Sequence, residues 1–110
     1  INAEALMKLR AKAPKKIAEN GYFLVYEEPA KKKDYIMCVD VSRGRGQDYS
    51  TFTLIDISTR PFKQVATYRC NTISPILFPT IIYKYATLYN QAYTIIESMG
   101  LPQNRLYLYC

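Results

Sequence analysis

The sequence predicts an α/β fold, in which a three-strand antiparallel meander is followed by a crossover helix and a strand parallel to the first. Two near-continuous apolar runs, 35–42 and 92–97, each carry a carboxylate close to the end. Between them lie two strand-like runs and one amphipathic stretch. The chain has 110 residues, 49% of them hydrophobic and 22% charged. We therefore expect one packed domain at most.

Residues 2–20 predict a helix, because Leu6, Leu9, Ala13 and Ile17 recur at three- and four-residue spacing before Gly21. A proline at position 14 is expected to break it into two pieces. We interpret residues 1–20 either as a helical linker from a preceding domain or as an ordinary amino-terminal helix.

Residues 22–26 form a short aromatic and β-branched run, and 27–34 are a polar turn with three lysines. The run at 35–42 is almost continuously apolar and predicts a strand buried on both faces of a central sheet. Strands at 51–57 and 63–70, joined by a short turn, complete the antiparallel meander.

Ser74 and Pro75 give the signal of a helix start, and an apolar stripe runs from there to about Asn90. Pro79 offers a second starting point, because proline fits the first turn of a helix. The run at 92–97 is then a strand, and a helical crossover makes it parallel to the strand at 35–42. This order is that of the beginning of a ribonuclease-H-like mixed sheet, and it brings Asp40 and Glu97 to one edge.

The net charge is +6, and after Asp56 the one remaining carboxylate side chain is Glu97. This favours a polyanionic partner, nucleic acid above all, over a basic surface that serves solubility alone. There is no histidine and there are three widely spaced cysteines, which excludes the usual structural zinc sites. Cys38 and Cys70 are expected to be reduced, buried and hydrophobic, as in a reducing cytoplasm. No apolar run is long enough to span a membrane.

Asp40 and Glu97 lie 97 − 40 = 57 positions apart, at the ends of apolar runs where an unpaired acid is costly. Together they predict a site for Mg²⁺ or Mn²⁺, of the kind in which two ions cleave a phosphodiester. For either acid alone, contact with solvent or with a basic side chain is the favoured explanation, and it is the pair that favours a metal. Asp48 adds an acid from the loop or caps backbone amides, and Asp56 is interpreted as structural.

The glycine-containing loop 44–48 lacks the Gly-Lys-Ser/Thr ending of a phosphate-binding loop and leads into a strand. Arg43 and Arg45 are candidates for holding nucleic-acid phosphates, with solvated loop arginines as the alternative.

Three segments are similar to the nuclease domain of DNA-packaging terminase large subunits of the T-even tailed-phage type: YIMCVDVSRGRGQDYS at 35–50, NTISPILFP at 71–79 and TIIE at 94–97. The resemblance covers about residues 21–97. It implies an Mg²⁺-dependent endonuclease that cuts concatemeric double-stranded DNA with two ions held by three acids. Asp40 matches the first acid, Glu97 the second, and Asp48 a supporting loop position. Residues 1–20 then match the connection from an ATPase domain.

The resemblance implies a third acid beyond residue 110, and residues 98–110 diverge from the family pattern. We therefore expect a truncated nuclease domain that is incomplete at the carboxyl end, binds metal weakly, has little or no activity in isolation, and leaves one sheet edge and one sheet face uncovered. Expected partners are double-stranded DNA and, for the full-length protein, the terminase small subunit and the portal. The expected setting is the cytoplasm of the infected bacterial host.

Two alternatives come from other classes of protein. A nucleotide-binding domain of the actin and sugar-kinase type shares the sheet, although its phosphate loop wants glycine where this chain has Ser42. A non-catalytic module that binds DNA or a packaging partner is the other.

Overall fold

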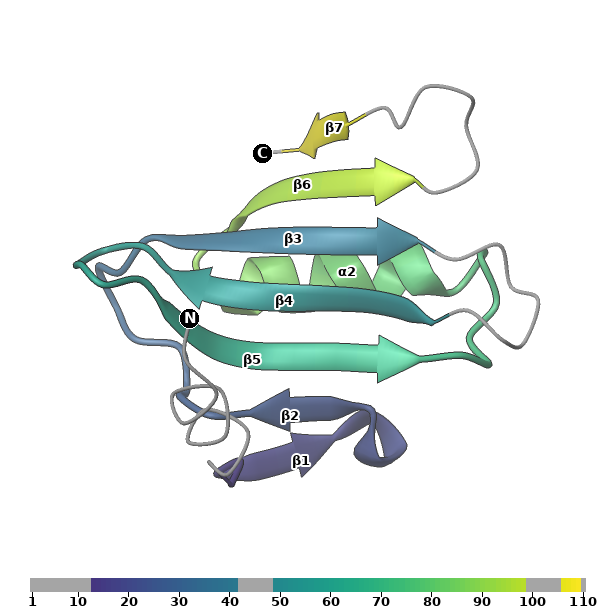
Figure 1. The fold of residues 1–110 in the computed structure, drawn as a ribbon, viewed down its shortest axis with the longest axis horizontal. Helices are drawn as coiled ribbons and strands as arrows, with labels where there is room; N and C mark the ends of the chain where they lie inside the picture. Colours follow the sequence, from purple (N-terminus) through teal and green to yellow (C-terminus); the bar gives the residue numbers. More distant parts are fainter. Residues whose placement is uncertain (1–12, 42–48, 99–105, 110) are drawn as a thin grey trace, which may run out of the picture.

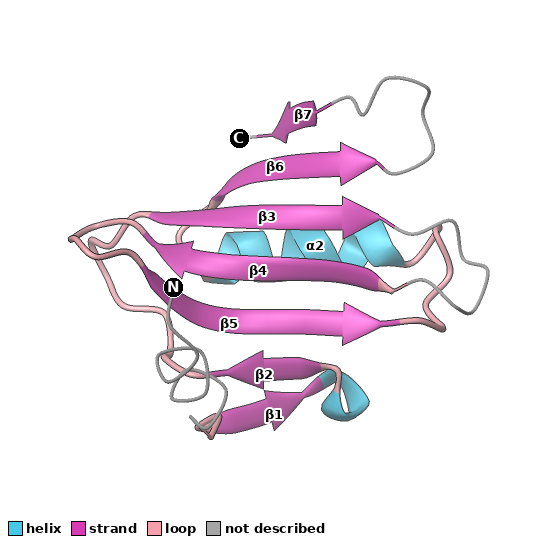
Figure 2. Ribbon diagram, in the orientation of Figure 1, coloured by secondary structure: helices cyan, strands magenta, loops and turns pink. Residues whose placement is uncertain are grey.

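The computed structural model describes residues 13–41, 49–98 and 106–109. Within them, seven strands form one sheet in the order β1-β2-β5-β4-β3-β6-β7, and an α-helix lies on one face (Figure 1). Figure 2 separates the strands from the helix and from a short 3-10 turn. The elements are β1 Lys16–Ala18, the 3-10 turn Glu19–Gly21, β2 Phe23–Val25, β3 Tyr35–Val41, β4 Ser50–Asp56, β5 Lys63–Cys70, α2 Phe78–Leu88, β6 Tyr93–Ser98 and β7 Leu106–Tyr109.

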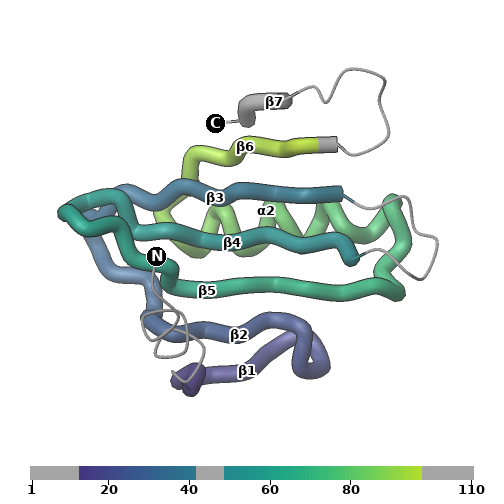
Figure 3. Tube along the Cα trace, in the orientation of Figure 1, coloured from purple at the N-terminus to yellow at the C-terminus, as the bar shows by residue number. Residues whose placement is uncertain are grey.

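The meander and the crossover predicted from the sequence are confirmed. Strands β3, β4 and β5 pair antiparallel in chain order, and β6 returns after α2 to pair parallel with β3. Figure 3 follows this path along the chain. The observed strand bounds differ from the predicted ones by a residue or so, because clear turn residues separate the apolar runs.

The core lies between the sheet and α2 and is built largely from aromatic rings. Phe52 of β4 stands at its centre, 1% exposed, and its ring stacks on Tyr68 with centroids 5.1 Å apart. Phe78 and Tyr85 of α2 approach the same ring at 6.4 and 6.1 Å. Offset aromatic contacts of this kind stabilise a core beyond the area they bury. The helix is therefore held against the middle of the sheet.

Burial alternates along β3, so the prediction that this strand is buried on both faces is wrong. Met37 and Val39 point toward α2 and are buried, whereas Cys38 and Asp40 are exposed. Side chains of a strand alternate between the two faces, and α2 packs against one of them. In the described part of the chain no helix packs against the other face, which we call the open face. The expected burial of Cys38 is therefore wrong, while Cys70 is buried as predicted.

The predicted helix at residues 2–20 is also wrong where the structure describes it. Lys16–Ala18 form β1, an edge strand paired antiparallel with β2. The next three residues, Glu19–Gly21, all have positive φ angles, of 52°, 56° and 92°. Pairing with a sheet edge has overridden the helical pattern, which is a weak preference in so short a segment. Residues 1–12 lie outside the described residues, and the linker role of 1–20 stays a prediction.

The turn at Glu19 is tied to α2. The Glu19 carboxylate accepts hydrogen bonds from the Tyr85 hydroxyl and from Lys84 Nζ, and these hold its pKa below the ordinary value. The β1-β2 edge is thereby anchored to the helix that covers the core.

The helix begins at Phe78 with Pro79 in its first turn, in agreement with the later of the two predicted starts. Ser74 begins the turn before it: the Leu77 amide donates to Ser74 Oγ at 3.2 Å. After the helix, the Asn90 side-chain amide donates to the carbonyl oxygens of Ala30 and Lys33 at 2.8 and 2.9 Å. These bonds fix the point at which the chain turns back into β6.

The tail beyond Glu97 contributes a strand to the sheet. β7 pairs antiparallel with β6, so the sheet edge that was expected to be uncovered carries a further strand.

Candidate metal centre

Asp40 and Glu97 occupy matching positions on neighbouring parallel strands. Asp40 of β3 is the register partner of Glu97 of β6, and both residues are exposed. Register partners on adjacent strands lie about 4.8 Å apart and point to the same face. The two carboxylates that sequence analysis selected are therefore brought side by side.

The alternation of each strand decides which face receives them. Val39 is buried on the α2 side and Ile96 packs against the same core, so the residues next to them point the other way. Both acids consequently stand on the open face, near the carboxyl ends of their strands, where water reaches them. This placement lowers the cost of keeping two charges at the end of apolar runs.

No counter-charge is paired with either acid in the described residues. The ion pairs found there are Lys33 with Asp56 and Lys84 with Glu19. Like charges directly opposite each other on neighbouring strands destabilise a sheet. A divalent cation between Asp40 and Glu97 would remove that repulsion.

The donor set suits magnesium or manganese. The described residues contain no group of three or more histidine, cysteine or acidic side chains around one point. Two carboxylates are nevertheless a common protein contribution to Mg²⁺, because this ion keeps several water molecules and binds substrate phosphates. The residues present therefore fit a hard divalent cation that is also open to a phosphate.

Asp56 has the structural role that its position suggested. Its side chain is 3% exposed, and it accepts hydrogen bonds from Lys33 Nζ at 3.0 Å and from the Ser58 amide at 2.9 Å. Burial acts to raise its pKa, but the Ser58 and Lys33 hydrogen bonds outweigh burial and leave the pKa below the ordinary value. Asp56 lies opposite Tyr35 at the start of β3, far from Asp40 along the strand.

The other predicted site residues, Asp48, Arg43 and Arg45, lie outside the described residues. Two residues that sequence analysis did not select, Arg69 and Tyr49, share the open face with the acids. Arg69 of β5 is the register partner of Thr51, which in turn is the partner of Asp40, and Arg69 contacts Tyr49. The alternation of apolar and polar residues along 63–70 could have identified Arg69 as exposed. Tyr68 and Cys70 face the core, so Arg69 between them points to the other face.

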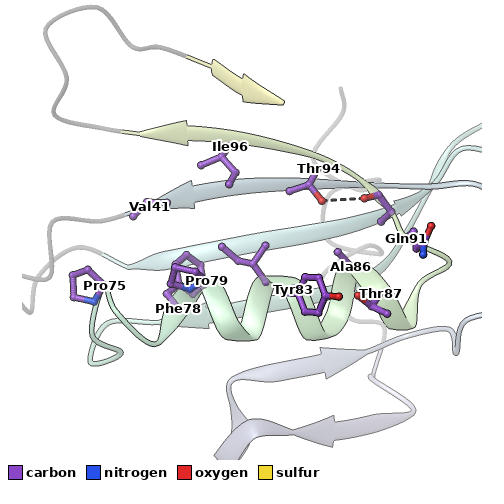
Figure 4. Close-up of a pocket in the computed structure, with 12 residues that line it drawn as sticks. Val41, Pro75, Phe78, Pro79, Tyr83, Ala86, Thr87, Gln91, Thr94 and Ile96 are labelled. Atoms are coloured by element: carbon purple, nitrogen blue, oxygen red, sulfur yellow. Dashed lines mark hydrogen bonds between the residues drawn. The ribbon is translucent and has the colours of Figure 1, made fainter. Parts of the chain in front are cut away.

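An apolar groove of about 550 Å³ lies on the opposite face of the sheet, beside α2 (Figure 4). Its lining includes Ile82 and Tyr83 of the helix and Val41, Thr94 and Ile96 of the strands. No acidic side chain lines it, so it is separate from the carboxylate pair.

The chain matches no protein-family model. Several solved structures share its fold, and three of them illustrate the match. The large terminase nuclease of thermophilic phage G20c with bound magnesium aligns with a TM-score of 0.66 and 22% identity over 84% of this chain and 47% of that one. The same nuclease with bound zinc gives 0.63 and 21% over 81% and 49%. The large terminase nuclease domain of Thermus phage P74-26 gives 0.62 and 20% over 88% and 57%.

The chain therefore has the ribonuclease-H-like fold of phage large terminase nuclease domains, as the sequence predicted. It spans about half the length of the solved domains that it matches. None of the helices in the described ranges is long and apolar enough to cross a membrane.

Proposed function

We propose that this chain is part of a divalent-metal-dependent DNA endonuclease of the large terminase type. The observation that carries the proposal is the pairing of Asp40 with Glu97, two exposed acids in register on parallel strands. Support comes from the shared fold with terminase nucleases, one of which, that of phage G20c, was solved both with magnesium and with zinc.

Asp40 and Glu97 would hold the cation, and Mg²⁺ or Mn²⁺ fits their oxygen donors best. In a complete domain we propose two ions. When bound, such ions activate water and stabilise charge on the phosphodiester. The contribution of the chain is geometric: the β3-β6 register fixes the separation of the two carboxylates, so that little rearrangement is needed when a cation binds.

Double-stranded DNA is the proposed substrate. The acids stand on the open face, where no described helix would obstruct a duplex, and the net charge of +6 favours a polyanion. Asp48 as a supporting acid, and Arg43 and Arg45 as phosphate contacts, remain predictions from the sequence. So do the terminase small subunit and portal as partners, and the cytoplasm of the infected host as the setting.

Nicking of supercoiled plasmid tests this function. The purified chain is incubated with plasmid in Mg²⁺ and in Mn²⁺ beside Asp40→Asn and Glu97→Gln, with Asp34→Asn as the matched control. Asp34 is an exposed acid immediately before β3, at the other end of the same strand. Because the third acid implied by the resemblance is missing, we expect slow metal-dependent nicking, which both site variants lose and the control retains.

Equal nicking by the wild-type chain and both site variants would contradict the proposal. A folded wild-type chain that binds DNA as Asp40→Asn does, and cuts in neither metal, would favour a non-catalytic binding module.

A further inference from the structure

We propose that Arg69 and Tyr49 form a phosphate-holding platform beside the acid pair, which grips a DNA backbone phosphate close to the one that is cut. This inference rests on the proposed function, and it identifies a positioning site that sequence analysis did not select.

Strand register places Arg69 in one row with the acids. Arg69 of β5 lies opposite Thr51 of β4, and Thr51 lies opposite Asp40 of β3. Glu97 of β6 completes the row across four adjacent strands. All four side chains point to the open face, because register partners share a face. The row therefore carries a positive end and a negative end on one exposed surface.

Tyr49 holds the Arg69 guanidinium in place. The guanidinium carbon lies 3.9 Å from the centroid of the Tyr49 ring, and that ring is itself 39% exposed. Stacking on an aromatic face is favourable for arginine and leaves its N–H groups free to donate hydrogen bonds in the plane of the guanidinium group. A side chain ordered in advance loses less entropy when it binds a phosphate.

The Arg69 side chain has no evident structural role in the described residues that would occupy its guanidinium group. No carboxylate pairs with it among the described residues, where the ion pairs belong to Lys33 and Lys84. Its own amide donates to the Tyr22 carbonyl oxygen at 3.0 Å, which no side-chain substitution removes. Its neighbours Tyr68 and Cys70 face the core, so the guanidinium itself contributes nothing to core packing.

The distance between Arg69 and Asp40 determines which phosphate Arg69 can reach when the acids act on the scissile one. Asp40 and Arg69 are two strand spacings apart, about 10 Å between their Cα atoms. One DNA strand carries a phosphate about every 3.4 Å of helix axis, so this span covers at most about three nucleotide steps. Arg69 would therefore grip a phosphate near the scissile one and fix the position of the strand, while the acids act at the bond.

The chain contains a matched control for this arrangement. In the turn between β4 and β5, the guanidinium carbon of Arg60 lies 5.5 Å from the centroid of the Phe62 ring, which is exposed as the Tyr49 ring is. That turn adjoins the beginning of β3, because Asp56 at the end of β4 pairs with Tyr35. Arg60 and Arg69 thus share charge and an aromatic neighbour and differ in which end of β3 they adjoin.

The test measures binding without cutting. In an Asp40→Asn background and in Mg²⁺, anisotropy of a fluorescein-labelled duplex gives the binding constant over a range of KCl concentrations. Arg69→Gln is compared with Arg69→Lys, Tyr49→Leu and Arg60→Gln, and circular dichroism checks that each variant is folded.

Arg69→Gln should flatten the dependence of log K on log salt by about 0.9, the loss of one released counterion. At 0.15 M salt that slope corresponds to binding about fivefold weaker, relative to a 1 M reference. Arg69→Lys should keep the slope, Tyr49→Leu should keep the slope but bind more weakly, and Arg60→Gln should match its parent.

Equal slopes for Arg69→Gln and Arg60→Gln would overturn the inference, and unchanged affinity in Tyr49→Leu would overturn the part played by the ring. Failure here is distinct from failure of the proposed function. A wild-type chain that does not nick plasmid, with a slope that still depends on Arg69, would refute the nuclease and leave the platform standing. A wild-type chain that nicks, with a slope indifferent to Arg69, would do the reverse.

Discussion

Asp40 of β3 and Glu97 of β6 are register partners on parallel strands and stand exposed on the same face of the sheet. The apolar runs that precede them supply the two strands, and α2 supplies the crossover that sets them side by side. The relationship therefore depends on the whole α/β unit, from β3 to β6.

Neutralising Asp40 should raise the thermal midpoint slightly in the absence of metal, because it removes repulsion between like charges on neighbouring strands. In Mg²⁺ the order should reverse, since a ligand that binds the native state stabilises it and Asp40→Asn loses that ligand. Differential scanning fluorimetry with and without Mg²⁺ measures both effects. Asp34→Asn should respond to Mg²⁺ as the wild-type chain does; an equal response from Asp40→Asn would refute this account of the pair.

Acid should destabilise the fold through Asp56. Its folded-state pKa is lowered, so its stabilising contribution is complete above the unfolded value of about 3.9 and is lost as the pH falls through the folded value. Asp56→Asn should cost about 1–3 kcal/mol near neutral pH and flatten the acid limb of the stability curve. Urea unfolding from about pH 7 to pH 2 measures this.

Glu19 has a lowered pKa as well, so part of the acid sensitivity should persist in Asp56→Asn. The exposed acid Glu28 provides the control: Glu28→Gln should leave the curve almost unchanged. A curve for Asp56→Asn that runs parallel to the wild-type curve would contradict the stabilising role of the Asp56 carboxylate and its ion pair with Lys33.

The aromatic centre of the core makes a third prediction. Phe52→Ala should lower the free energy of unfolding by about 3–5 kcal/mol, because it opens a cavity among Phe23, Tyr68 and Phe78. Chemical denaturation followed by circular dichroism gives the value. Phe62→Ala, at a residue 54% exposed, should cost under about 0.5 kcal/mol. Similar losses of unfolding free energy in the two variants would contradict the central position of Phe52 in the core.

Cys38 reports on the open face, two residues before Asp40 along β3. In a Cys110→Ser background a thiol reagent should modify Cys38 and spare buried Cys70. Partial desolvation by the surrounding protein raises the pKa of the Cys38 thiol, so the rate should still be rising with pH near 9. Duplex DNA in the Asp40→Asn background should slow the reaction if the duplex covers the open face. An unchanged rate with DNA bound would place the duplex on another surface.

The central strands were predictable because their apolar runs are long and bounded by clear turns. The runs ending near Asp40 and Glu97 needed the crossover helix between them, and this order of elements predicts the parallel pairing that the structure shows. The acid pair could be selected for the same reason.

The remaining features depend on pairing and coverage, which the sequence pattern does not specify. Residues 16–18 carry helix-favouring side chains but pair with β2, and an apolar run does not tell which of its faces a helix will cover. Cys38 was therefore placed inside the protein by mistake. Arg69 was not predicted as a site residue, because it comes near Asp40 only through the pairing of both β3 and β5 with β4, which the sequence pattern does not specify.

The central claim is that Asp40 and Glu97 together hold a divalent cation. Calorimetric titration of Mn²⁺ into the wild-type chain, Asp40→Asn, Glu97→Gln and Asp34→Asn tests it most directly, because it requires neither DNA nor turnover. We predict binding by the wild-type chain and by Asp34→Asn, with affinity at least about tenfold weaker in each site variant. Binding of wild-type strength in either Asp40→Asn or Glu97→Gln would contradict the claim.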